Sequence, residues 1–149
     1  MKSMVIKAFI DTNILIDFLN QGREDHTYAV HILDLICKHK IEGLITTQSI
    51  IDAAFVCRRC EGYDEDVFRA TILRLLGKIN LGYLNYFHIK TALADNNKDL
   101  EDNAQIANAE DESCDVFLTH DKKLLSRPKR KYMQIMTPKE FLSRCLVND

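Results

Sequence analysis

Short apolar runs alternate along the chain with longer segments in which apolar residues recur at helical spacing. The runs short enough to form buried strands cover residues 4–10, 44–46, 116–119 and 134–136. The segments with helical periodicity or helix start and stop signals cover residues 13–20, 25–39, 49–60, 64–78 and 99–112. The aromatic segment 83–89 predicts a further strand, and Thr137-Pro138 predicts a helix start because proline suits the first helical turn.

Strands that alternate with helices predict an α/β fold with a parallel sheet covered by helices on both faces. No repeat, low-complexity tract or Pro/Gly-rich linker interrupts this pattern. A chain of 149 residues has the length expected of one domain, and we therefore interpret residues 1–149 as a single domain.

The composition excludes an intrinsically disordered chain, because 46% of the residues are hydrophobic and the formal net charge is only −2. The apolar run at the start is too short and too interrupted for a signal peptide or a membrane span. An odd number of cysteines, five, without a secretion signal indicates reduced thiols. We therefore expect a cytoplasmic protein with no membrane partner.

Charge is unevenly spread towards the end of the chain. Residues 95–115 contain eight acids and one base, whereas residues 121–149 contain eight bases and three acids. Two solvated faces are the simplest account of these blocks. Because the net charge is near zero, any contact with nucleic acid has to come from a local patch such as the basic block.

Ligands of parallel α/β sheets bind beyond the carboxyl ends of the strands, which makes the residues after each strand informative. Asp11 follows the first expected strand, residues 46–49 follow the second, and His120-Asp121 follows the strand at 116–119. Each aspartate is equally suited to cap the helix that comes next, so neither identifies a site alone.

Three further acids have informative positions. Asp52 lies among apolar residues in an expected helix, where a carboxylate is costly unless it is paired, hydrogen-bonded or metal-bound. Alternatively, Asp52 is the capping-box partner of Ser49. Asp99 and Asp102 share one face of their helix, but both also fall in its first turn, where the helix dipole favours negative charge.

Together, Asp11, Asp52, Asp102 and Asp121 predict four carboxylates at one end of the sheet. These negative charges repel one another unless a divalent cation lies between them. Ligands that are all oxygen atoms suit Mg²⁺ or Mn²⁺, and such ions activate water and stabilise the leaving oxygen in phosphodiester hydrolysis.

The chain carries, in this order, Asp11-Thr12-Asn13 after a strand, Asp52 in an apolar helix, and the segments 99–109 and 114–121. This order resembles that of the PIN-domain family, which contains metal-dependent ribonucleases and, among them, the VapC-type toxins of bacterial toxin–antitoxin pairs. The resemblance covers residues 5–142. It implies a three-layer α/β/α sandwich with a parallel sheet of four to five strands, and an endoribonuclease that uses Mg²⁺ or Mn²⁺.

The resemblance also implies roles for single residues. The positions that match the family's catalytic acids are Asp11, Asp52, Asp102 and Asp121. The residues expected to bind the metal are Asp11, Asp102 and Asp121, with Asp99 as an additional acid seen in one branch of the family. Asn13 is expected to orient Asp11 by a hydrogen bond, and Thr119 is expected to line the same pocket.

Two positions depart from the family's pattern. Asp52 stands where relatives usually have Glu, which keeps the charge but shortens the side chain by a methylene group. His120 stands where relatives often have Arg, which implies a weaker phosphate contact at that position.

The partners implied by the resemblance are an RNA substrate, an antitoxin protein and a second copy of the chain in a homodimer. The candidate RNA-binding residues lie in a basic tract soon after Asp121 and are Arg127, Lys129, Arg130 and Lys131. An ordinary solvated turn is the alternative interpretation of this tract.

Three other functions are compatible with parts of the pattern. A PIN-type domain that binds RNA or protein without cutting is favoured by Asp52 in place of Glu. A haloacid-dehalogenase-like phosphatase would also place Asp11 after the first strand, but it needs a second acid where this chain has Asn13. A receiver domain would need Asp52 at a strand end, whereas the pattern places this residue inside a helix.

Overall fold

The structure, a computed structural model, describes residues 4–147, in which five parallel strands form one sheet in the order β3-β2-β1-β4-β5. The strands are β1 (Lys7–Ile10), β2 (Glu42–Thr46), β3 (Asn80–Gly82), β4 (Val116–Leu118) and β5 (Gln134–Met136). The expectation of a parallel sheet with four to five strands is therefore confirmed.

Helices follow every strand of the sheet. They are α1 (Thr12–Leu19), α2 (His26–Cys37), α3 (Thr47–Cys57), α4 (Glu65–Leu76), α5 (Tyr86–Ala94), α6 (Leu100–Asp111), α7 (Lys122–Leu125) and α8 (Pro138–Val147). The helices predicted from periodicity are all present, whereas α5 and the short α7 were not expected. No helix among residues 4–147 is long and apolar enough to cross a membrane.

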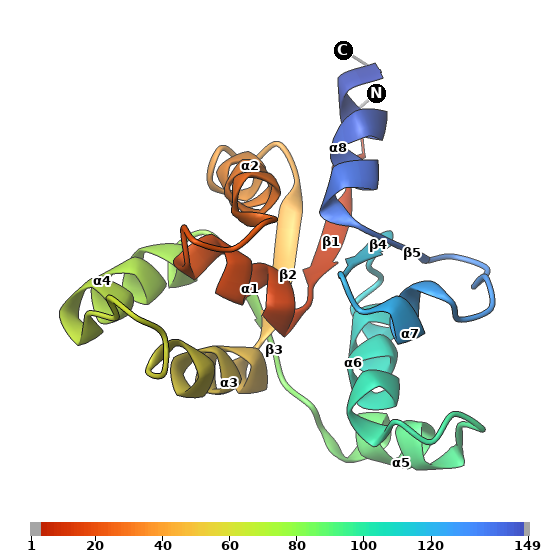
Figure 1. The fold of residues 1–149 in the computed structure, drawn as a ribbon. Helices are drawn as coiled ribbons and strands as arrows, with labels where there is room; N and C mark the ends of the chain where they lie inside the picture. The colour runs from red at the N-terminus through yellow and green to blue at the C-terminus, as the bar shows by residue number, and fades with distance from the viewer. Residues whose placement is uncertain (1–3, 148–149) are drawn as a thin grey trace.

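Side chains of the central strand β1 point alternately into two apolar cores, as the two-residue period of a strand requires. Ala8 and Ile10 enter a core shared with α1, α2, α3, α4 and α8, whereas Phe9 enters a second core shared with α6 and α7. In the second core the rings of Phe9 and Phe117 stack with their centroids 4.6 Å apart. Helices thus cover both faces of the sheet (Figure 1), which confirms the three-layer α/β/α sandwich.

The strand predicted over residues 83–89 is wrong. The strand β3 lies just before it, and most of the aromatic segment belongs to α5. Asn85 is the physical reason: its side chain accepts a hydrogen bond from the backbone N–H of His88, while Nδ1 of His88 accepts one from the backbone N–H of Asn85. This capping box starts a helix, and Phe87 is therefore 63% exposed on a helix surface.

Gly82 allows a close approach between the sheet and α6. A Cβ atom at this position would lie 2.5 Å from Oδ1 of Asn108, a residue of α6 that is only 1% exposed. Since the buried amide has little room to move, only glycine fits at the end of β3.

We expect Gly82→Ala to lower the free energy of unfolding by about 1–3 kcal/mol, because the added methyl group overpacks this contact. Gly77→Ala is the matched control: its φ is −76°, and its added Cβ would meet a backbone oxygen only at 3.5 Å. The control should change stability by less than about 1 kcal/mol. Urea unfolding measures both variants, and equal effects would contradict the close approach.

Candidate metal centre

Asp11 lies at the carboxyl end of β1, where it is also the N-cap of α1. Its Oδ1 accepts a hydrogen bond from the backbone N–H of Thr12, and its Oδ2 accepts one from the hydroxyl of Thr119, both at 2.7 Å. The side chain is 6% exposed. Burial raises the pKa of Asp11 against the lowering effect of these two hydrogen bonds, and the nearby charge of Asp121 raises it further.

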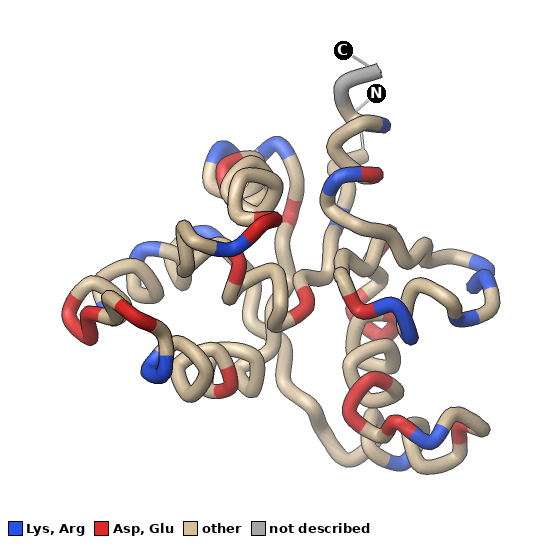
Figure 2. The backbone as a smooth tube through the Cα atoms, viewed as in Figure 1, with Lys and Arg blue, Asp and Glu red and all other residues tan. Residues whose placement is uncertain are grey.

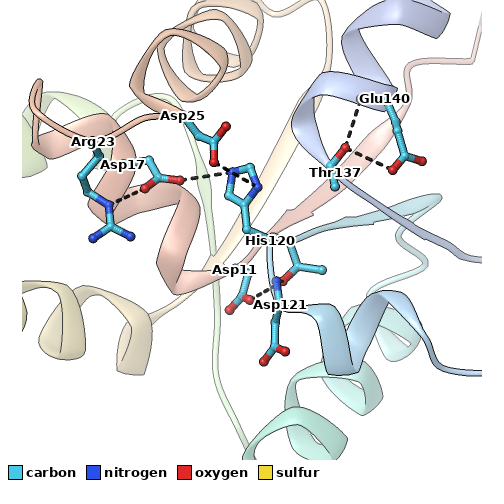
Figure 3. A network of polar contacts seen from close by, with 9 residues as sticks. Asp11, Asp17, Arg23, Asp25, His120, Asp121, Thr137 and Glu140 are labelled. Atoms are coloured by element: carbon cyan, nitrogen blue, oxygen red, sulfur yellow. Dashed lines mark hydrogen bonds and ion pairs between the residues drawn. The ribbon is translucent and has the colours of Figure 1, made fainter.

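Asp121 reaches the same edge of the sheet from the loop after β4, where it caps α7. Its backbone N–H donates to the hydroxyl oxygen of Thr119 at 2.9 Å, and its Oδ1 accepts from the backbone N–H of Lys123 at 2.8 Å. The Thr119 hydroxyl therefore links both acids. The side chains of Asp11 and Asp121 lie close together in Figure 3.

Asp102 brings a third carboxylate from the first turn of α6, whose N-cap is Asp99. The side chain is 9% exposed, and its Oδ2 is buried without a hydrogen-bond partner. Burial, followed by the charges of Asp99, Asp121 and Asp11, raises the pKa of Asp102 to about 6. Acids from β1, the β4–α7 loop and α6 are thus close enough for their charges to act on one another.

The residues present at this site fit a divalent cation. A buried carboxylate oxygen without a partner is costly, and coordination of a cation would satisfy it. The donor atoms of Asp11, Asp102 and Asp121 are all oxygen, which suits Mg²⁺ or Mn²⁺ better than the softer transition metals.

Asp52 is positioned differently from the sequence-based expectation. It lies on α3, where Thr46 is the N-cap and accepts a hydrogen bond from the backbone N–H of Ser49 at 3.1 Å. The capping-box interpretation of Asp52 is therefore wrong. The expectation that Asp52 is buried among apolar side chains is also wrong. Asp52 is half-buried, and the nearby Phe55 is 59% exposed. Oδ1 of Asp52 accepts a hydrogen bond from Gln48.

Glu101 is a site residue that the sequence analysis did not single out. It lies beside Asp102 in the first turn of α6, and its pKa is raised by burial and then by the charges of Asp52, Asp11 and Asp99. The charge of Asp52 on α3 therefore acts on Glu101, as do the charges of Asp11 and Asp99. The sequence did carry a signal for Glu101, because three of the four residues 99–102 are acids.

Asn13 does not bond to Asp11 as the resemblance implies, and His120 pairs with two acids. Asn13 is exposed, and Asp11 is oriented by Thr12 and Thr119 instead. His120 turns towards α1 and the start of α2, where its Nε2 lies 3.1 Å from Oδ2 of Asp17 and its Nδ1 lies 3.6 Å from Oδ2 of Asp25 (Figure 3).

Among residues 4–147, Asp17, Asp25 and His120 are the one group of three candidate ligands whose ligand atoms all lie within 4.8 Å of one another. Arg23 already pairs with Oδ1 of Asp17 through its Nε. Although burial opposes it, hydrogen bonds from His120 and Arg23 hold the pKa of Asp17 below its ordinary value, and the same bond to Asp17 raises the pKa of His120. Asp17 thus has a cationic partner in Arg23, whereas Oδ2 of Asp102 has no hydrogen-bond partner.

The basic tract occupies the loop between α7 and β5, where Figure 2 shows Lys and Arg gathered. It lines a surface pocket shared with the loop before α6; the lining residues are Asp95, Asn96, Asn97, Glu110 and Arg127–Lys131. Arg130 pairs with Glu110, whereas Arg127 is half-buried and its charge lowers the pKa of Asp102. The tract is therefore next to the acidic cluster.

Comparison with known proteins gives consistent matches. The family model of the PIN domain matches residues 7–123 of the chain. Ribonuclease VapC1 of Aquifex aeolicus (strain VF5) is 26% identical over 140 residues, which cover 93% of this chain and 94% of that protein.

Solved structures share the fold at low sequence identity. A toxin–antitoxin complex from Klebsiella pneumoniae contains a chain with a TM-score of 0.63 and 19% identity, covering 88% of this chain and 97% of that one. VapC20 of Mycobacterium tuberculosis, described as a sarcin-ricin loop cleaving toxin, has a TM-score of 0.60 and 14% identity, covering 77% and 90%. At these identities the similarity shows the fold.

We expect Asp102→Asn to raise the free energy of unfolding by about 1–2 kcal/mol at neutral pH in EDTA. Burial and the neighbouring acids raise the pKa of Asp102 from 3.8 to about 6 on folding, so its deprotonation destabilises the folded state as the pH rises through this interval. The advantage of the variant should shrink as the pH falls below about 6 and vanish near about 4.

Urea unfolding at several pH values measures this effect. Asp66→Asn, at an exposed acid in the first turn of α4, is the control and should bring no gain. A difference between wild type and Asp102→Asn that is independent of pH would contradict the account.

Proposed function

The chain belongs to the PIN-domain family, and we propose that it is a metal-dependent endoribonuclease that hydrolyses RNA phosphodiester bonds. The observation that carries the proposal is the cluster of Asp11, Asp102 and Asp121, with a buried oxygen of Asp102 that lacks a partner. RNA as substrate is supported by the name of the Aquifex relative, which is a ribonuclease.

In this proposal Asp11, Asp102 and Asp121 hold Mg²⁺ or Mn²⁺, and Asp99 adds its charge from the N-cap of α6. When bound, such an ion lowers the pKa of a water molecule and stabilises charge on the phosphate. Thr119 fixes the carboxylate of Asp11 by its hydrogen bond.

Asp52 is proposed as the fourth catalytic acid. Its carboxylate is coupled to that of Glu101, which in turn is coupled to Asp11.

The basic tract is proposed to bind the RNA backbone through Arg127, Lys129, Arg130 and Lys131. Lys129 and Lys131 are exposed, as side chains that meet phosphates need to be. Arg130 pairs with Glu110, so its contact with RNA requires exchange of that ion pair. The charge of Arg127 lowers the pKa of Asp102, so in this proposal Arg127 would meet the phosphate nearest to the cleavage site.

A role as the toxin of a toxin–antitoxin pair is the finer form of the proposal, supported by the structural relative from a toxin–antitoxin complex. We further propose that the chain binds an antitoxin partner and forms a homodimer. It would act in the cytoplasm, with residues 1–149 as one domain. Exposed apolar side chains on α3 and α5, such as Phe55, Phe87 and Leu93, offer surface for protein partners.

The second candidate function is a PIN-type domain that binds RNA or protein without cutting. It is favoured by Asp52 in place of Glu and by the hydrogen bond that engages Asp52 with Gln48. Cleavage assays separate the two functions, because a non-cutting domain binds RNA without producing fragments.

We expect the purified protein to cleave members of a mixed RNA panel with Mn²⁺ or Mg²⁺, and Asp11→Asn to lose more than about 100-fold of this activity while remaining folded. Loss of the carboxylate removes the central ligand. Asp66→Asn is the control on α4 and should cleave normally. Full activity in Asp11→Asn or in EDTA would overturn the proposal, and RNA binding without cleavage would favour the second candidate.

The double variant Lys129→Ala/Lys131→Ala should raise KM for RNA about tenfold, leave kcat unchanged, and reduce the salt slope of binding by about two. The reason is the loss of two cations that meet phosphates. Lys38→Ala/Lys40→Ala, before the amino end of β2, removes the same charge at the opposite edge of the sheet and is the control. Equal effects of both pairs would indicate general electrostatics in place of a binding tract.

A further inference from the structure

Three consecutive residues after β4 point in opposite directions. Thr119 and Asp121 contribute to the acidic cluster, whereas His120 between them reaches the ion-pair network of Asp17 and Asp25 (Figure 3). The loop between β4 and α7 is therefore held from two sides.

Asp17 is a firm anchor for His120. It is 3% exposed, and its carboxylate is also bound by Arg23 from the α1–α2 loop. Its backbone oxygen lies 2.8 Å from Nδ1 of His26, the first residue of α2. The end of α1, the following loop and the start of α2 are thus joined around one buried carboxylate.

Asp11 caps the start of α1, and Asp17 lies six residues later within this helix. Six residues correspond to about 9 Å along a helix. The β4–α7 loop contacts the first through Thr119 at 2.7 Å and the second through His120 at 3.1 Å. Backbone hydrogen bonds hold the start of the loop at Leu118 and Thr119, and these two side-chain contacts add anchors on α1. Two separated contacts fix both its distance and its orientation, and with them the position of Asp121 relative to Asp11.

We propose that His120 is a positioning residue, which sets the placement of Asp121 against Asp11 by tethering the β4–α7 loop to Asp17 and Asp25. Arg23 pairs with one oxygen of the Asp17 carboxylate, so protein side chains form the tether. The consequence for ion binding rests on the proposed function, whereas the tether itself does not.

The test compares three variants. His120→Leu removes the tether, and His120→Arg keeps two donors that reach both carboxylates, so it should rescue the loss. His88→Leu is the control, because the buried His88 also pairs with an aspartate, the exposed Asp111 at the far end of α6, at 2.8 Å. His120→Gln, with one donor, replaces His120→Leu if the latter does not fold.

The first measurement is amide hydrogen exchange without metal. The backbone N–H groups of Asp121 and Lys123 are protected by Thr119 and by the Asp121 carboxylate. In His120→Leu they should exchange more than about fivefold faster, whereas in His120→Arg and His88→Leu they should stay within about twofold of wild type. Unchanged exchange in His120→Leu, or equally fast exchange in His88→Leu, would overturn the tether.

The second measurement is Mn²⁺ binding, followed by the electron paramagnetic resonance signal of the free ion at a temperature where all variants are folded. His120→Leu should bind Mn²⁺ about tenfold more weakly, as expected when a residue that orients a ligand is lost, and His120→Arg should restore binding. Wild-type affinity in His120→Leu would overturn the link to the site. If the wild type itself binds no Mn²⁺, the proposed function fails while the exchange data still decide the tether.

Discussion

The hydrogen bond from the Thr119 hydroxyl to Asp11 is the contact on which the rest of the site depends. It continues the pairing of β1 with β4, in which Ile10 lies opposite Leu118 and the backbone N–H of Asp11 donates to the carbonyl of Leu118 at 3.1 Å. Because the strands are parallel, both end at the same edge, and the stacked rings of Phe9 and Phe117 fix them from the core side. The placement of Asp11 against Thr119 is therefore set by a fully buried part of the sheet.

The structure gives a physical account of how so many carboxylates share one edge. Asp11, Asp99 and Asp121 are each the N-cap of a helix, so each accepts a backbone N–H at the positive end of a helix dipole. Capping and ion binding, which the sequence presents as alternatives, are compatible because each carboxylate oxygen can accept more than one contact. Asp102 differs, since its Oδ2 is buried without a partner, and burial followed by the neighbouring charges raises its pKa to about 6.

Periodicity predicts the helices and the parallel sheet because burial of one face dictates both patterns. The prediction fails over residues 83–89, where aromatic side chains suggest a strand but the capping box of Asn85 and His88 starts a helix. Acids at strand ends are likewise visible in the sequence, since topology alone brings Asp11 and Asp121 together.

Contacts between distant segments are what the sequence does not reveal. The pairing of His120 with Asp17 joins residues from opposite ends of the chain, and no local pattern marks it. Glu101 is close to Asp52 and Asp11 only because α3 and α6 are brought to one edge by the sheet. Asn13, whose place in the motif suggests a bond to Asp11, is exposed, and the Asp11 carboxylate accepts from Thr12 and Thr119 instead.

The central claim is that Asp11, Asp102 and Asp121 form a divalent-cation site at the carboxyl ends of β1 and β4. Anomalous diffraction from crystals soaked in Mn²⁺ tests it most directly. The account predicts a manganese peak among these three carboxylates, with Mn–O distances of about 2.2 Å. A peak at Asp17, Asp25 and His120 in its place, or no peak at either group, would contradict it.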